Sequence, residues 1–238
     1  MRIPHVCGLI LYALFFPNLV VAEAPAKPTS HTTRKIEGWT VRIDDRLLDG
    51  PDSQIGTEAI RLLEGQLHTI RFVVPTDRVK QLQRVTIQLD ATYDTLRPAQ
   101  YHPSVDWLAG KGYDRNLARC VHIPNARDFA NPRHHREQPF VLMHELAHAY
   151  HDQVLNFDNP KIAAAFQEFR KKPAYQKTLH INGSRTRHYA LTNPKEFFAE
   201  MTESYFGQND FYPFNSAELK EGEPELFELL ESIWGKLP

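Results

Sequence analysis

The sequence predicts a single α+β domain, in which a small sheet packs on a mainly helical body. Two runs, Trp39–Ile43 and Val85–Leu89, alternate apolar and polar residues, as half-buried strands do. Longer segments between turn residues carry apolar side chains at helical spacing. Hydrophobic residues make up 42% and charged residues 24% of the 238 residues. This composition is that of a globular protein, and the length suits one moderate core.

The first residues form a segment of their own. Arg2 precedes an almost wholly apolar run from Val6 to Phe16, and small residues suited to cleavage follow at 20–24. This pattern is typical of a secretory signal peptide, here residues 1–22, so we expect an exported protein, either secreted or periplasmic. A retained membrane anchor is the alternative, although the apolar run is short for spanning a bilayer.

Residues 23–37 are rich in Ala, Pro, Thr and Ser and have no apolar period, which predicts a flexible linker. The folded domain is then expected over residues 38–238. Cys7 lies in the predicted signal peptide, so Cys120 is the one cysteine of the mature chain. No intrachain disulfide can form there, and the fold must be held by its core and by any bound metal.

The formal net charge is −1. Such a balance argues against nucleic acid or an anionic membrane surface as a partner. No stretch after residue 22 approaches the ~18 apolar residues of a membrane-spanning helix, so no integral membrane association is expected after signal cleavage. We expect a monomer.

The front of the domain combines strands, one helix and a long loop. After the first strand, Thr57 is suited to cap a helix that runs to Ile70, because apolar residues recur there at helical spacing. Residues 90–114 are aromatic and contain Pro and Gly, which predicts a loop. The segment 119–124 is expected to be a short strand ended by proline.

Residues 125–136 are polar and predict a surface loop, in which His134 and His135 are solvated. Proline and glycine delimit the helices that follow the centre of the chain. These helices are predicted over Lys161–Lys172, ended by Pro173, over Pro194–Phe206, ended by Gly207, and over Pro224–Trp234.

The chain is organised around His144-Glu-Leu-Ala-His148, an H-E-x-x-H pattern. Residues four apart share one face of a helix, so both imidazoles can reach a single metal ion, for which Zn²⁺ is the usual occupant. No Gly or Pro interrupts residues 140–155, and Pro139 suits a helix start. Glu145 follows the first histidine and can act as general base toward a water on the metal. The alternative is a chance match on an ordinary core helix.

A third ligand is expected from the helix that begins at Pro194. Glu196 and Glu200 lie four residues apart among apolar neighbours, where unpaired carboxylates are costly to desolvate. Glu196 can complete a His₂Glu site with an open fourth position, and Glu200 can fix the tautomer of a ligand histidine. A solvated acidic stripe is the alternative. Glu203 continues the acidic side without an evident role and is assigned to the surface.

These motifs together resemble those of the gluzincin zinc peptidases, and most of all the group of the anthrax lethal factor catalytic domain. The resemblance covers roughly residues 121–213 and rests on His144–His148 followed by Asn193–Glu200. It implies a zincin-like metallopeptidase domain over residues 38–238, with Glu196 as third zinc ligand and Glu200 behind a histidine. It also implies that Tyr189, seven residues before Glu196, stabilises the oxyanion.

The implied function is a secreted zinc endopeptidase with one Zn²⁺ and a peptide or protein substrate. Zinc bound by His144, His148 and Glu196 would activate water, and Glu145 would take its proton. Two alternatives remain: an inactive member that binds zinc or a partner, and a zinc hydrolase of a non-peptide bond. A metzincin is excluded, because that motif needs Gly and His where this chain has His151 and Val154. We expect His151 to serve packing or a surface hydrogen bond.

Overall fold

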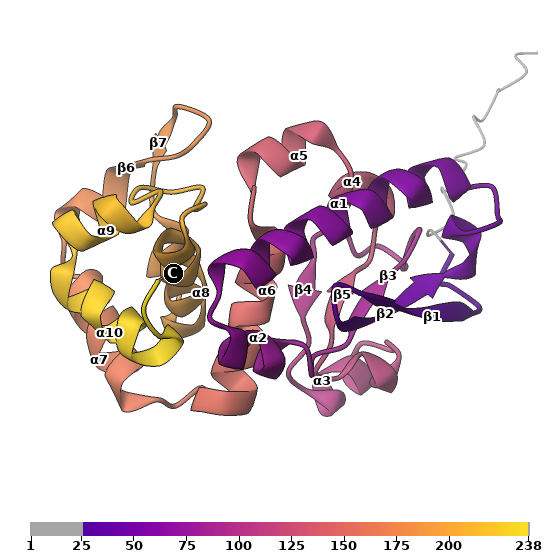
Figure 1. The fold of residues 1–238 in the computed structure, drawn as a ribbon, viewed down its shortest axis with the longest axis horizontal. Helices are drawn as coiled ribbons and strands as arrows, with labels where there is room; N and C mark the ends of the chain where they lie inside the picture. Colours follow the sequence, from indigo (N-terminus) through magenta and orange to yellow (C-terminus); the bar gives the residue numbers. More distant parts are fainter. Residues whose placement is uncertain (1–25, 238) are drawn as a thin grey trace, which may run out of the picture.

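The computed structural model of the chain describes residues 26–237 (Figure 1). The predicted signal peptide lies outside the described residues. The predicted combination of helices with a small sheet is confirmed, and the sheet is mixed, with parallel and antiparallel neighbours. Over residues 26–237, every helix is too short or too polar to cross a bilayer.

The sheet has the strand order β1-β2-β3-β5-β4. Its three central strands run parallel, and each edge strand is antiparallel to its neighbour. The register aligns Val41 with Ile87 and Ile87 with Val121, so apolar side chains from all three central strands share one face. The bounds are β1 His31–Ile36, β2 Trp39–Asp44, β3 Ile87–Leu89, β4 Gln100–Tyr101 and β5 Val121–Ile123.

Helix α1 (Ser53–Val73) runs across the sheet and buries one side of itself in the main core (Figure 1). Its buried apolar residues recur at positions 59, 63, 67 and 70, the spacing of a single helix face. The short helix α2 (Thr76–Leu82) follows and contacts the central helix α6 (Val141–Tyr150). The sheet and α1 thus build one wall around α6.

The opposite side of α6 is covered by helices from the C-terminal part of the chain (Figure 1). The main contact of α6 is with α8 (Pro194–Phe206), which in turn packs on α7, α9 and α10. A small hairpin, β6–β7, lies above these helices in the view. The bounds are α7 Pro160–Phe169, β6 Thr178–Leu179, β7 Arg185–Thr186, α9 Ser216–Gly222 and α10 Pro224–Trp234.

Short elements connect these layers. A π-helical turn, η3, continues α6 directly. The bounds are η1 Asp45–Leu47, α3 Val105–Gly110, η2 Arg115–Leu117, α4 Ala126–Phe129, α5 Pro132–Glu137, η3 His151–Leu155, η4 Pro173–Lys177 and η5 Tyr189–Leu191.

The prediction of a flexible linker is wrong for residues 31–36, because they form strand β1. A two-residue turn at Glu37 and Gly38 joins β1 to β2, and φ is positive at both residues (49° and 93°). Two left-handed residues give the turn that suits a tight hairpin. At Gly38 an added Cβ would lie 2.2 Å from Nε2 of the Gln83 side chain, which would have to move from its hydrogen bond with the Glu37 carbonyl.

Several predicted boundaries are also wrong. Helix α1 starts at Ser53 rather than after Thr57, whose hydroxyl donates to the Ser53 carbonyl within the first turn. The predicted loop at 90–114 contains β4 and α3, and the predicted loop at 125–136 contains α4 and α5. His134 is nevertheless exposed, as expected. The helices Pro194–Phe206 and Pro224–Trp234 are confirmed at both ends.

Candidate functional site

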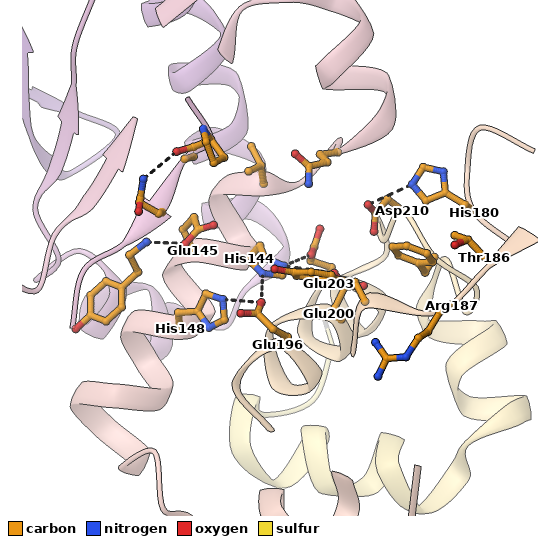
Figure 2. Close-up of a pocket in the computed structure, with 18 residues that line it drawn as sticks. His144, Glu145, His148, His180, Thr186, Arg187, Glu196, Glu200, Glu203 and Asp210 are labelled. Atoms are coloured by element: carbon orange, nitrogen blue, oxygen red, sulfur yellow. Dashed lines mark hydrogen bonds and ion pairs between the residues drawn. The ribbon is translucent and has the colours of Figure 1, made fainter. Parts of the chain in front are cut away.

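Helix α6 places both motif histidines on the side that faces α8 (Figure 2). Its remaining faces are anchored in the core, since Leu142, Leu146 and Ala149 are fully buried. The rings of His144 and His148 lie 4.8 Å apart between centroids, one helical turn from each other. The predicted pairing of the two imidazoles on one face is therefore present.

Helix α8 places Glu196 opposite these histidines. The Asn193 side chain accepts hydrogen bonds from the amides of Lys195 and Glu196, and Pro194 occupies the first turn. This cap fixes where the helix begins and leaves Glu196 in its first turn, beside α6. Gly207, with φ 102°, ends the helix in the left-handed conformation.

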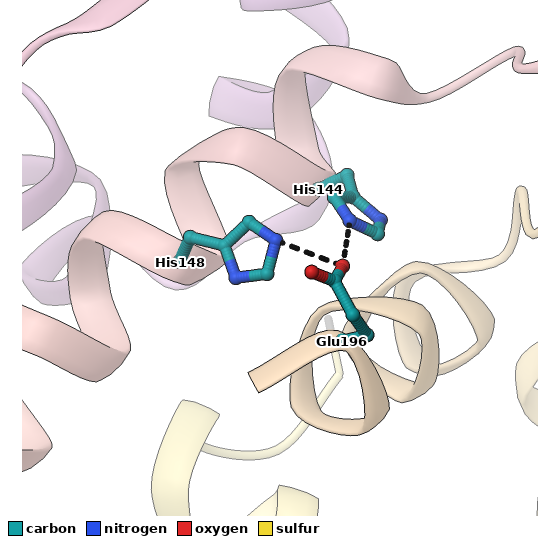
Figure 3. Close-up of side chains that lie close together, drawn as sticks. All are labelled: His144, His148 and Glu196. Carbon is teal, nitrogen blue, oxygen red and sulfur yellow. Dashed lines mark hydrogen bonds and ion pairs between the residues drawn. The ribbon is translucent and has the colours of Figure 1, made fainter. Parts of the chain in front are cut away.

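Three potential ligand atoms converge between the two helices (Figure 3). Oε2 of Glu196 lies 3.1 Å from Nε2 of His144 and 3.2 Å from Nε2 of His148. With zinc–ligand bonds of ~2.0–2.1 Å, the ligand atoms of a tetrahedral site lie about 3.3 Å apart. The donor set fits Zn²⁺ by chemistry, and the two nitrogen–oxygen distances are close to this value.

The far side of His144 is held by Glu203. Nδ1 of His144 lies 2.6 Å from Oε1 of Glu203 and 3.8 Å from Oε1 of Glu200. A proton on Nδ1 shared with a carboxylate leaves the Nε2 lone pair free for a metal. The assignment of Glu203 to the surface is wrong, because its exposed fraction is 3%. It also takes the tautomer-fixing position predicted for Glu200.

The carboxylates behind the histidines differ in their electrostatics. Burial raises the pKa of Glu203 to about 7, against the opposing effect of the hydrogen bond with His144. Burial also raises the pKa of Glu200, and the neighbouring carboxylates of Asp210 and Glu203 raise it further. For Glu196 burial opposes ionisation, but hydrogen bonds with both histidines outweigh it and lower the pKa below the ordinary value.

Glu145 points to the opposite side of the histidines from Glu203. Its Oε2 accepts a 2.7 Å hydrogen bond from the backbone amide of Tyr101 in the edge strand β4. The Tyr101 hydroxyl in turn donates to Asp152, 2.6 Å away on η3. Burial raises the pKa of Glu145, the direction that suits a group that accepts a proton near neutral pH.

Tyr189 lies beside the histidines on η5, just before α8. Its ring centroid is 6.3 Å from that of His144, and 48% of its surface is exposed. Burial raises its pKa, as does the negative charge of Glu196, so the phenol keeps its proton at neutral pH. The hydroxyl is thus a protonated donor at the edge of the site.

All six predicted site residues line one pocket of about 580 Å³ between β4, α6, α8 and the β6–β7 hairpin. This volume falls within the ~300–1,000 Å³ typical of ligand sites. Sequence reasoning missed His180 and Asp210, which also line the pocket. Their separation along the chain from the motifs left no spacing signal. The missed Glu203 did carry a signal, because it is seven residues, or two helical turns, after Glu196.

Two other residues considered from the sequence lie outside the pocket. His151 is fully buried and packs between Phe157 and Phe198, with ring centroids 5.2 and 4.9 Å away, which confirms a packing role. Cys120 is buried and accepts a hydrogen bond from Arg42 at 3.2 Å. Burial raises the pKa of its thiol, so Cys120 is not an activated nucleophile.

Comparison of the chain with protein-family models, curated proteins and solved structures gave no match.

Proposed function

We propose that this chain is an exported zinc-dependent endopeptidase with a zincin-like fold. One observation carries the proposal: two histidine nitrogens and a Glu196 oxygen converge in a pocket that Glu145 also lines. A purely structural zinc site closes its fourth position and has no use for a neighbouring carboxylate. The combination of an incomplete ligand set with an adjacent base therefore favours hydrolysis.

Each residue has a role that its geometry supports. His144, His148 and Glu196 would hold the ion, and Glu203 would keep His144 in the tautomer that presents Nε2. When bound, Zn²⁺ lowers the pKa of a water to about 7 and polarises a carbonyl. Glu145 would accept the proton of the attacking water and pass it to the leaving amine. The Tyr101 amide donates to Oε2 of Glu145, which holds the carboxylate in place beside the histidines.

Tyr189 would donate a hydrogen bond to the oxygen on which negative charge develops. Three features support this role: its position before α8, its exposure to the pocket and its protonated phenol. Residues 98–101 also line the pocket and would contact the bound peptide. The proposed substrate is a peptide or a protein segment.

A zinc-dependent digest of a random peptide library tests the proposal. We expect cleavage by the zinc-loaded chain, loss of cleavage after chelation, and recovery with about one equivalent of Zn²⁺. Substitution Glu168→Gln, on the exposed face of α7, is a matched control and should cleave normally. Zinc binding without cleavage of any peptide would contradict the proposal and favour either an inactive metal-binding protein or a hydrolase of another bond.

A further inference from the structure

Tyr101 joins the edge strand β4 to the helix that carries Glu145, and it does so at two points. Its backbone amide donates to Oε2 of Glu145 at 2.7 Å, and its hydroxyl oxygen lies 2.6 Å from Oδ2 of Asp152. Glu145 and Asp152 are seven residues apart, and α6 continues into η3 without a break. Their side chains therefore leave the same side of the helix about two turns apart and hold one tyrosine at both ends.

The direction of the bond to Asp152 follows from the other partner of the phenol. The side-chain amide of Gln153 donates to the Tyr101 oxygen at 3.0 Å, so the hydroxyl proton is left for the carboxylate of Asp152. Burial raises the pKa of Tyr101, and the hydrogen bond with Asp152 raises it further, so the phenol keeps this proton at neutral pH. A hydroxyl that donates to a carboxylate forms one of the stronger hydrogen bonds in proteins.

The sheet by itself gives β4 little support. The strand has two residues and pairs only with β5, because it lies at the edge of the sheet. Pro98 and Pro103 flank it, and proline has no backbone N–H to donate. The contacts of Tyr101 with α6 and η3 therefore add the anchoring that a two-residue ladder lacks.

The carboxylate of Glu145 depends on this strand for its orientation. Glu145 is 7% exposed, and within residues 26–237 the Tyr101 amide is the one hydrogen-bond donor to its carboxylate. A displacement of β4 would therefore release the carboxylate from its only fixed donor in that part of the chain. The hydroxyl of Tyr101 and the carboxylate of Asp152 oppose such a displacement from the other end of the side chain.

We propose that Asp152 is a positioning residue for hydrolysis: by holding Tyr101, it fixes the amide that orients the Glu145 carboxylate. The inference rests on the proposed peptidase function, in which Glu145 accepts a proton. A general base acts only within hydrogen-bond reach of its proton donor, so a small displacement of its carboxylate costs rate. Asp152 is not among the residues that line the pocket, and it acts on turnover through Tyr101.

Hydrogen exchange of the Tyr101 amide tests this anchoring without any catalysis. The protein is the full chain labelled with ¹⁵N-tyrosine, with zinc and without it, and the Tyr101 signal is the one that disappears in Tyr101→Phe. We expect Asp152→Ala to speed exchange of this amide by at least about tenfold, because the strand opens more easily. The amide of Tyr205, on α8, is the control in the same sample and should change less than about twofold.

Steady-state kinetics on a cleaved library peptide measures the consequence for turnover. Asp152→Ala and Tyr101→Phe should each lower kcat by about 10- to 100-fold, while KM and zinc affinity change less than about threefold. The double variant should lose no more than the larger single loss, because both substitutions break the same link. Tyr205→Phe is the matched control, because it removes a hydroxyl that donates to the Gly235 carbonyl at 2.8 Å, and it should keep the wild-type kcat.

The conservative variant Asp152→Asn separates the hydrogen bond from the charge. Asparagine keeps an oxygen that can accept the Tyr101 proton, so slow amide exchange and kcat should recover to within about threefold of wild type. An Asn variant as impaired as Asp152→Ala in both measurements would overturn the inference. If Asp152→Ala does not fold, Tyr101→Phe labelled with ¹⁵N-phenylalanine gives the same exchange measurement at the same amide.

Three further results would overturn the inference: unchanged exchange of the Tyr101 amide in Asp152→Ala, faster exchange with a wild-type kcat, and additive losses of kcat in the double variant. A wild-type chain that cleaves no peptide would instead sink the peptidase. The exchange measurement would then still decide the structural link, since faster exchange in Asp152→Ala keeps it and unchanged exchange removes it.

Discussion

Nδ1 of His144 and Oε1 of Glu203 lie 2.6 Å apart, whereas the nearest oxygen of Glu200 is 3.8 Å from the same nitrogen. We therefore expect Glu203→Ala to weaken zinc binding by about 10- to 100-fold, the usual effect of losing a partner behind a ligand histidine. Glu200→Ala should weaken it several-fold less. Competition with a chromogenic chelator measures both affinities, and equal losses would contradict the assignment of Glu203.

Glu145→Gln should retain zinc and lose hydrolysis. Glutamine keeps an oxygen that can accept the Tyr101 amide hydrogen bond, so the strand β4 stays in place, but it cannot take a proton. General-base catalysis contributes about 10²- to 10⁴-fold, and kcat/KM should fall by that factor. Zinc content and the melting temperature serve as controls. Wild-type cleavage by this variant would remove Glu145 from the mechanism.

Tyr189→Phe should reduce kcat by about 10²-fold with little change in KM, because an oxyanion donor acts mainly in the transition state. The side chain is about half exposed, so the loss of one hydroxyl should leave the free energy of unfolding nearly unchanged. Steady-state kinetics and urea unfolding measure the two effects. An unchanged kcat would reduce Tyr189 to a residue that only lines the pocket.

His151 should make the fold sensitive to acid. Burial, together with the charges of His148 and Lys195, lowers its pKa from 6.5 to about 4. The unfolded chain therefore binds a proton below pH 6.5 while the folded chain does not. The neutral ring contributes its full share to the free energy of unfolding above pH 6.5. This contribution is lost as the pH falls toward 4, by about 1.4 kcal/mol per pH unit.

The substitution His151→Leu removes this loss, because leucine fills a similar volume between Phe157 and Phe198 and does not titrate. We expect its free energy of unfolding, relative to wild type, to rise between pH 6 and 4.5 by about 1.4 kcal/mol per unit. His68→Leu, at an exposed position of α1, is the control. Parallel pH curves for His151→Leu and wild type would contradict the expectation. Urea unfolding of the metal-free proteins gives the values.

The elements predicted best from the sequence are those whose ends are marked by proline or glycine. Pro194 marks the start of α8, because proline has no N–H to donate to a preceding helical turn. Gly207 marks its end, because glycine readily adopts the left-handed conformation of the cap. The same local rules, with the four-residue spacing of His144 and His148, were enough to place two imidazoles together. They could not show that Glu196 would face them, which depends on the packing of α8 against α6.

The missed features depend on tertiary contacts. Strand β1 has one buried residue, Ile36, so it lacks the alternation that identifies a strand with a core-facing side. It exists because β2 supplies hydrogen bonds at the sheet edge. Glu203 and Glu200 were equally acidic in the sequence, and the rotation of α8 decides which of them meets His144. Local propensity carries no information on that rotation.

The two ligand helices belong to different halves of the molecule, α6 against the sheet side and α8 within the C-terminal helices. A cation shared by His148 and Glu196 would cross-link those halves and close a chain loop of 48 positions. The described part of the chain holds no disulfide to do this, because Cys120 is its one cysteine and is free. A bound metal would thus add stability to the packing of α6 against α8 as well as supply chemistry.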